Sequence, residues 1–211
     1  MFVGHYGVSF AAKRVAPTVP LWVLFIAVQL LDVLWAPFVL LGIEKVRIVP
    51  GITASNPFDL YYMPYTHSLL AAVLWSGAAL LGYRVSSKQD RAGKAAFVVA
   101  LAVLSHWVCD FVVHRPDLPL YDNTAKVGLG LWNAPAIAFA LEATLLFGGM
   151  WLYIGPAGVP RRGLILFGLV MLAIQAYVFF GPPPVSDSAA AWTALASYAV
   201  FGAIIARMER A

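Results

Sequence analysis

The sequence contains a single cysteine, Cys109, and only 11% charged residues over its 211 positions. One cysteine excludes an internal disulfide and any zinc motif built from paired cysteines. The low charge, together with 62% hydrophobic residues and a mean hydropathy of +0.81, excludes an ordinary soluble domain. The net charge of +4 does not indicate a nucleic-acid partner, because the Lys and Arg residues form short clusters between apolar runs rather than a basic patch.

Apolar runs of roughly 18 residues or more are long enough to cross a bilayer. They cover approximately 20–43, 64–83, 94–115, 130–155, 163–181 and 188–207. Residues 1–16 are too short to cross and are expected to form a half-helix packed into the bundle. We therefore predict an all-α fold, a polytopic transmembrane helical bundle of about six spans, forming a single integral membrane domain over 1–211. Residues 144–207 are expected to be supporting helices for a site within about 4–142.

The basic residues predict how the spans are oriented. Those expected on one side of the membrane are Lys13, Arg14, Arg84, Lys88, Arg91, Lys94, Arg161, Arg162, Arg207 and Arg210. Loops rich in Lys and Arg stay in the cytoplasm. Both termini are therefore predicted to be cytoplasmic in an inner (plasma) membrane protein, with the loops 44–63 and 116–129 facing outward.

Ionisable residues stand out in these apolar runs. They are His5, Asp32, His67, His106, Asp110, His114 and Glu142. Such groups are costly in a bilayer and therefore mark function. His106, Asp110 and His114 recur at i, i+4 and i+8, so they share one face of a helix.

The depth of these residues predicts a common site. With a rise of about 1.5 Å per residue, Asp32, His106 and Glu142 lie roughly 18–20 Å above the cytoplasmic boundary, and His67 and Asp110 about 24 Å above it. His5 fits the same layer if residues 1–16 form a helix. One site in the outer half of the membrane is therefore expected.

Imidazole and carboxylate groups without thiolate suit zinc first, and manganese or iron as alternatives. The predicted metal ligands are His5, Asp32, His67, His106, Asp110 and His114. Their number favours two ions bridged by Asp110, an arrangement that generates hydroxide near neutral pH and neutralises phosphoryl charge. Asp110 and Glu142 are the predicted catalytic residues, with Glu142 open to three roles: general base, partner of a ligand histidine, or protonated structural residue.

Three further residues are candidate substrate contacts: Ser68, Arg115 and Lys126. Ser68 is better suited to cap a helix or to donate to a neighbouring ligand than to act as a nucleophile. Arg115 and Lys126 are equally suited to anchor the protein at the membrane surface. Gly128 and Gly130 allow close backbone approach beside the site, although a lone Gly-x-Gly is weak evidence for phosphate binding.

The order of motifs is Gly4-His5, Asp32, Tyr65-Thr66-His67-Ser68 and His106-x-x-x-Asp110. It resembles the bacterial family of membrane-bound metal-dependent hydrolases. It is also similar to the ligand order of the zinc-dependent phospholipase C and single-strand nuclease superfamily, an all-helical fold.

The resemblance covers roughly residues 4–142 and implies His5, Asp32, His67, His106 and Asp110 as ligands, with Asp110 bridging. Two features depart from the soluble superfamily. Its amino terminus is a ligand, a role not evident for Met1, and its later His-x-x-x-carboxylate pair is missing because no histidine follows His114.

These observations predict a membrane-embedded, metal-dependent hydrolase that acts on an ester. A phosphoester of a lipid or amphiphile is the expected substrate, since a site in the outer leaflet is reached most easily by a molecule already there. The alternatives are a metal or proton transporter, a haem-binding membrane protein with axial histidines, and a non-catalytic scaffold.

Overall fold

The computed structural model describes residues 1–87, 92–154 and 161–210, and this part of the chain is mostly helical, as predicted. Its α-helices are α1 (Val3–Val15), α2 (Leu21–Val28), α3 (Leu30–Leu40), α4 (Leu69–Ser86), α5 (Ala92–Val113), α6 (Pro135–Ile154), α7 (Arg161–Phe180) and α8 (Asp187–Met208). Two short strands, β1 (Lys45–Ile48) and β2 (Phe58–Tyr62), and a 3-10 turn, η1 (Leu131–Asn133), complete the fold. Lys88 and Arg91, which entered the orientation argument, lie outside the described residues.

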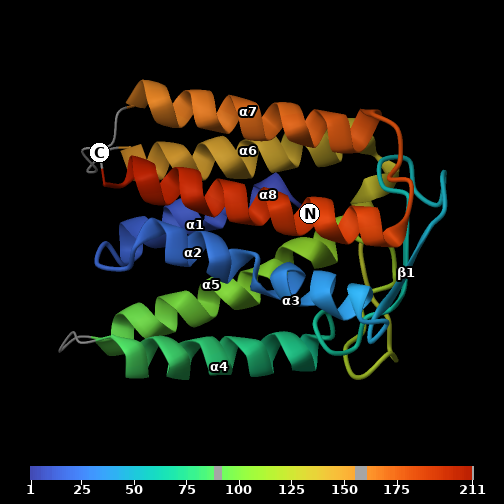
Figure 1. The fold of residues 1–211 in the computed structure, drawn as a ribbon, viewed down its shortest axis with the longest axis horizontal. Coiled ribbons are helices and arrows are strands. Elements are labelled where there is room, and N and C mark those ends of the chain that lie inside the picture. The colour runs from blue at the N-terminus through green and yellow to red at the C-terminus, as the bar shows by residue number, and fades with distance from the viewer. Residues whose placement is uncertain (88–91, 155–160, 211) are drawn as a thin grey trace.

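Five helices, α4 to α8, are long and apolar enough to cross a membrane. They lie roughly along one direction, with the strands and long loops gathered at one end of the molecule (Figure 1). The first predicted span, 20–43, is not one continuous helix: α2 and α3 are bent by 54° with respect to each other and pass the same test only as a pair. The described residues thus supply five candidate spans, or six if the bent pair is counted as one.

The bend between α2 and α3 falls at Gln29, whose φ of −107° and ψ of 7° leave the helical range. It disturbs the regular backbone ladder and makes the Val28 carbonyl oxygen available to the ring of His106, 2.7 Å away. The Gln29 side chain also donates to the carbonyl of Phe2. Irregular backbone of this kind is tolerated in an apolar bundle where protein groups satisfy it. Hydropathy missed the bend because residues 20–43 are apolar enough on both sides of it to be taken as one span.

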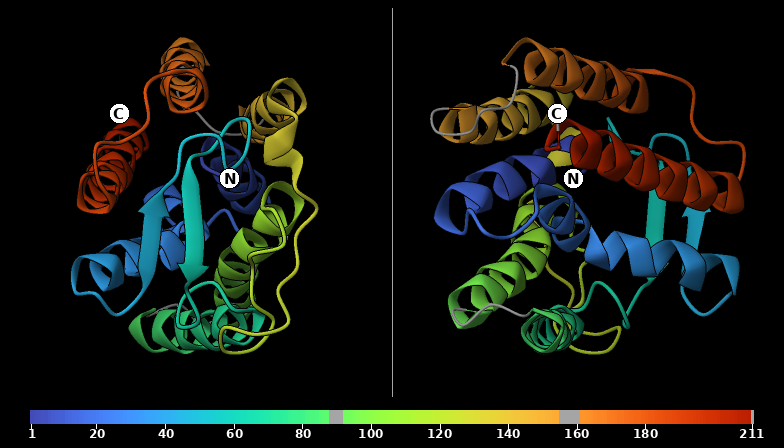
Figure 2. Two further views of the ribbon diagram at one scale, coloured as in Figure 1. Left: turned by 90° about the vertical axis from the view of Figure 1, so that its right-hand side faces the viewer. Right: turned by 60° about the vertical axis from the view of Figure 1, so that its left-hand side comes forward.

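The amino-terminal helix α1, expected from residues 1–16, lies in the interior of the bundle (Figure 2). Its residues Val3, Tyr6 and Phe10 are fully buried. Two glycines allow it to approach α6 directly: a Cβ on Gly7 would lie 2.0 Å from the Leu145 carbonyl oxygen, and one on Gly149 would lie 2.0 Å from the Gly7 carbonyl oxygen. This close packing fixes α1, and with it His5, against α6.

The predicted loop 44–63 contains a small antiparallel sheet that an all-α prediction did not include. Lys45 pairs with Tyr62, Arg47 with Asp59 and Ile48 with Phe58, with an irregularity after Lys45. The hairpin lies across the loop end of the bundle (Figure 2). It therefore covers this end of the bundle.

The loop after α5 is fixed to the end of that helix. The N–H groups of Leu129 and Gly130 donate to the carbonyl oxygens of Phe111 and His114. Gly128 has a φ of +152°, and a Cβ there would lie 2.3 Å from the Arg115 carbonyl oxygen. The close approach expected of Gly128 is therefore directed at the end of α5, next to His114.

Candidate metal centre

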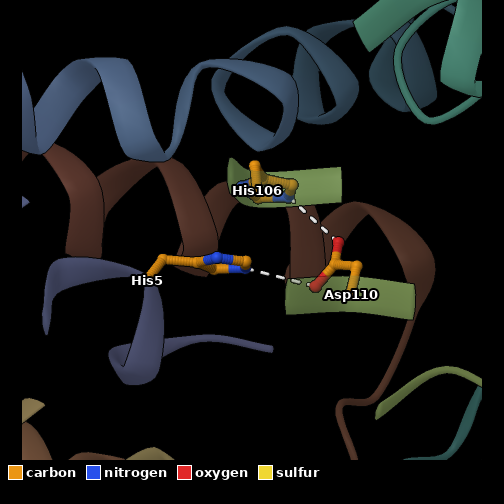
Figure 3. Close-up of side chains that lie close together, drawn as sticks. All are labelled: His5, His106 and Asp110. Carbon is orange, nitrogen blue, oxygen red and sulfur yellow. Dashed lines mark ion pairs between the residues drawn. The ribbon is translucent and has the colours of Figure 1, made fainter. Parts of the chain in front are cut away.

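Asp110 of α5 is the centre of the cluster, and the nitrogens of four histidines surround it. Its Oδ2 lies 3.1 Å from His106 Nε2, 3.6 Å from His114 Nε2 and 3.8 Å from His67 Nε2. Its Oδ1 lies 3.2 Å from His5 Nε2, and Figure 3 shows His5 and His106 directed at the two oxygens. All five side chains are buried.

Asp32 of α3 adds a second carboxylate. Its Oδ1 lies 3.2 Å from His67 Nε2 and 3.7 Å from His106 Nε2. Two groups of potential ligands therefore adjoin, namely His5, His106 and Asp110, and Asp32, His67 and His106; the ligand atoms within each group lie within 4.8 Å of one another. The predicted ligands thus come together from α1, α3, α5 and the turn before α4.

Hydrogen bonds on the far side of the rings determine which nitrogen faces the cluster. His106 Nδ1 contacts the Val28 carbonyl oxygen at 2.7 Å, and His114 Nδ1 contacts Asp117 Oδ1 at 2.9 Å. Each acceptor requires a proton on Nδ1, which leaves the lone pair of Nε2 free. Metal-binding histidines are commonly oriented by carbonyl and carboxylate partners of this kind.

His67 is oriented by a chain of two polar groups. The Thr66 hydroxyl donates to Glu44 Oε2 at 2.6 Å and lies 2.7 Å from His67 Nδ1, so it accepts the ring proton. Glu44 Oε1 also accepts from the backbone N–H groups of Tyr65 and Thr66. Burial raises the pKa of Glu44, while His67 and these hydrogen bonds act in the opposite direction. Sequence reasoning noted Thr66 only as part of a motif, and Glu44 carried no signal because it lies in a loop.

The buried nitrogens test whether a metal ion fits. Within the described part of the chain, His106 Nε2 and both ring nitrogens of His5 have no hydrogen-bond partner. His106 and His5 approach Asp110 at 3.1 and 3.2 Å, but in directions that make no hydrogen bond. Unpaired buried polar atoms are costly. Convergence of imidazole nitrogens on carboxylates is therefore the arrangement that a divalent ion would satisfy.

The start of the chain closes one side of the cluster. The Met1 amino group donates to Asp110 Oδ1 at 2.6 Å, so the amino terminus lies at the cluster, a position that was not evident for Met1 from the sequence. Glu142 of α6 accepts from the N–H groups of Phe2 and Gly4 through Oε2, and from Gln175 Nε2 through Oε1. Glu142 thus adjoins the cluster and anchors the beginning of α1.

Two residues of the carboxyl-terminal helices complete the surroundings. Tyr198 of α8 donates to Asp32 Oδ2 at 2.8 Å, and Gln175 of α7 holds Glu142 at 3.0 Å. We expected 144–207 only to support the bundle, and neither residue was singled out from the sequence. A polar residue in an apolar run was the available signal for Gln175, whereas tyrosine is too common in such segments to be informative.

Ser68 does not line the cavity described below. It caps α4: its oxygen accepts from the N–H of Ala71, and its hydroxyl donates to the Pro64 carbonyl oxygen. The capping alternative considered for Ser68 agrees with this contact.

Arg115 and Lys126 are also engaged elsewhere and do not line the cavity. Arg115 forms ion pairs with Asp59 and Asp117, and Lys126 donates to the Tyr61 carbonyl oxygen. Burial lowers the pKa of Lys126. Their contacts fix the hairpin and the Asp117 partner of His114, and give no support to direct substrate binding.

A cavity of about 550 Å³ opens from the cluster. Its polar end is formed by Asp32, His67, Asp110, His114 and Glu142. Its remaining walls come mainly from α7, α8 and the segment 182–185 between them. A volume of this size is typical of sites that bind small molecules.

The fold and the site together define a mostly helical protein with apolar helices suited to a membrane and a buried His/Asp cluster suited to a metal ion. No family model matches the chain, and comparisons with curated proteins and with solved structures found no match.

Proposed function

We propose that α4 to α8 and the bent pair α2 and α3 cross the inner (plasma) membrane, with the carboxyl-terminal end in the cytoplasm. The cytoplasmic amino terminus expected from the sequence is wrong, because the Met1 amino group is buried inside the bundle against Asp110. The length and hydropathy of the helices support this arrangement, as does the concentration of Lys and Arg at the ends of the helices opposite the hairpin. In this orientation the His/Asp cluster lies toward the outer leaflet, and the hairpin faces outward.

The cluster would hold a divalent metal, with zinc preferred and manganese or iron as alternatives. His5, His106 and Asp110 would form one set of ligands, and Asp32, His67 and His114 adjoin it, enough for one ion or for two. The observation that carries this proposal is that imidazole nitrogens, two of them without a hydrogen-bond partner among the described residues, converge on the buried carboxylate of Asp110 and the partly buried carboxylate of Asp32. Neutral imidazole with ionised carboxylate is typical of hydrolytic rather than structural zinc sites.

The reaction that this site supports best is hydrolysis of an ester, with a phosphoester of a lipid or amphiphile as the substrate class. A bound divalent metal lowers the pKa of water and stabilises negative charge on phosphoryl oxygens. Asp110 would hold the site together from the middle of the histidines. Glu142 lines the same cavity, and we assign it the transfer of the proton released when water adds to the ester.

A haem site fits this arrangement poorly. The rings of His5 and His106 are stacked, with centroids 3.9 Å apart and an angle of 9° between them. Axial ligation by two histidines needs them on opposite sides of the iron. Here both rings face the Asp110 carboxylate.

Metal analysis tests the proposal before any substrate is chosen. Purified wild-type protein is expected to retain stoichiometric zinc, manganese or iron, and His106→Ala and Asp110→Ala are expected to lose it. Asp122→Asn is the control, since Asp122 is an exposed carboxylate in the loop after α5. Wild-type protein free of these metals, or variants that bind them like the wild type, would reject the metal site.

Activity is tested on the same preparations with phosphomonoesters, phosphodiesters and carboxyl esters, with and without a chelator. Hydrolysis by the wild type that stops on chelation and returns with zinc supports the hydrolase. Metal-loaded protein that hydrolyses none of them, but carries metal ions or protons across liposome membranes, would replace the hydrolase with a transporter.

A further inference from the structure

The cavity continues from the metal centre into a region that the catalytic proposal does not use. Away from the polar end it is bounded by Ile174, Tyr177 and Val178 of α7 and by Ala190, Ala194 and Ser197 of α8. These two helices form one side of the bundle, joined by the segment 181–186 at the hairpin end (Figure 2). The polar groups of the cluster are therefore continuous with a predominantly apolar space between two apolar helices.

The side chains of α8 explain why this space is not filled. Ala190 and Ala194 follow each other at a spacing of four residues, so these small side chains lie on one face of the helix. Opposite them, α7 contributes Ile174 and Val178, also four residues apart. Small residues such as these commonly let two helices pack closely against each other. Here the two helices do not close over the alanines, and a cavity lies between them.

The space reaches the outer surface of the helices. Tyr177 and Val178 line the cavity and are 64% and 45% exposed, and Val185, at the hairpin end, is 93% exposed. At the inner end Gln175 is fully buried, and its Oε1 has no hydrogen-bond partner among the residues that the structure describes. The cavity thus joins a surface suited to lipid with a polar centre suited to a metal and an anion.

We propose that this cavity binds the hydrocarbon chain of an amphiphilic phosphoester, which enters sideways between α7 and α8 and places its phosphate at the His/Asp cluster. The occupant is a single-chain amphiphile, because its two ends match the two ends of the cavity. The proposal rests on the proposed function for the chemistry at the cluster. It adds the part of the substrate that the protein recognises and the route by which the substrate arrives.

The first experiment measures the effect of chain length on hydrolysis. The probes are alkyl 4-nitrophenyl phosphodiesters with chains of two to ten carbons, kept below their aggregation concentrations, with the protein in nanodiscs. Water adds to phosphorus, the bond from phosphorus to the nitrophenyl oxygen breaks, and alkyl phosphate and 4-nitrophenol are released. Transfer of one methylene from water is worth about 0.8 kcal/mol, so kcat/KM should rise about fourfold per added carbon until the cavity is full.

Two substitutions on α8 distinguish the effect of filling the cavity from the effect of adding a ring elsewhere on the helix. Ala194→Phe places a ring in the cavity and should flatten the dependence on chain length. Ala196→Phe adds the same ring at an exposed position that does not line the cavity, and it should keep the dependence. Metal content, measured on both variants, reports whether the centre is intact. A chain-length dependence that Ala194→Phe leaves unchanged would overturn the proposal.

The second experiment measures binding without turnover. An alkyl phosphonate that carries a diazirine near the end of its chain is photolysed with the protein, and the labelled peptides are identified by mass spectrometry. Label is expected between Ile174 and Val178 and between Ala190 and Ser197, reduced at least fivefold by Ala194→Phe and not by Ala196→Phe. Label found elsewhere, or unchanged in Ala194→Phe, would contradict the chain site.

Together the two experiments show whether the proposed hydrolase activity or the proposed chain-binding site is wrong. Specific label without hydrolysis of any ester would support the chain site and refute the hydrolase. Hydrolysis that is independent of chain length, without label between α7 and α8, would support the hydrolase and refute the chain site.

Discussion

Replacing Thr66 by valine removes one hydroxyl from the chain that orients His67 and changes little else in size. In the wild type this hydroxyl lies 2.7 Å from His67 Nδ1 and donates to Glu44 Oε2 at 2.6 Å. Valine leaves the ring proton of His67 without an acceptor in a buried position. The backbone N–H of Thr66 still donates to Glu44, so the turn before α4 is expected to remain in place.

The expected loss of zinc affinity is taken from other proteins in which the hydrogen-bond partner of a metal-binding histidine was removed. Removal of such a partner lowers metal affinity by about 10-fold to 100-fold, or about 1.4–2.8 kcal/mol. A buried group left without its hydrogen bond costs about 1–3 kcal/mol in stability. Thr66→Val should therefore fold, release zinc to a chelator at a concentration 10-fold to 100-fold lower than the wild type does, and unfold at a lower temperature.

Chelator competition and thermal unfolding in detergent measure the two effects. Thr66→Ser keeps the hydroxyl and should restore most of the affinity. Ser76→Ala is the matched control, because it removes a buried hydroxyl that donates within α4 to the Ala72 carbonyl oxygen. If Thr66→Val binds zinc as tightly as the wild type, the Glu44–Thr66 chain does not orient a metal ligand, and the assignment of His67 fails with it.

Three further predictions concern other parts of the site. Gly149→Ala should destabilise the protein by about 1–3 kcal/mol or more, because its Cβ meets the backbone of α1. Gly148→Ala, where a Cβ meets nothing within 4 Å, should leave the unfolding temperature nearly unchanged, and equal effects of the two would contradict the close packing. Tyr198→Phe removes the donor to Asp32 and should weaken zinc binding about 10-fold in chelator competition. Glu142→Gln should keep its metal but lose at least about 100-fold in kcat, and full activity would exclude Glu142 from proton transfer.

The helices were largely predictable because their signal is local. The apolar runs 163–181 and 188–207 correspond to α7 and α8, and the half-helix expected from residues 1–16 corresponds to α1. The features that the sequence prediction missed, a bend and two strands, also have local causes. The bend at Gln29 falls within a continuous apolar run, and the short strands β1 and β2 lie in a segment with no long periodic pattern.

The cluster of histidines and carboxylates was predictable because ionisable groups are rare in apolar helices and because a helix converts sequence spacing into height. Helical rise predicted one layer for His5, Asp32, His67, His106 and Asp110, and the structure brings these side chains together. Height carries no information about rotation around each helix axis. The groups that orient the histidines lie in loops, on backbone carbonyls or on other helices, where spacing carries no information about contact.

The sequence by itself determined that the chain is helical and apolar and that histidines and carboxylates share a level within it, since hydropathy and helical rise are properties of each segment alone. Only the tertiary structure decided which ring nitrogen faces Asp110, that Glu44 acts on His67 through Thr66, and that α7 and α8 leave a cavity beside the cluster. These features depend on how separate helices are rotated and spaced against one another. Packing between segments distant in the chain sets that rotation and spacing, so they cannot be inferred from the sequence of any one segment.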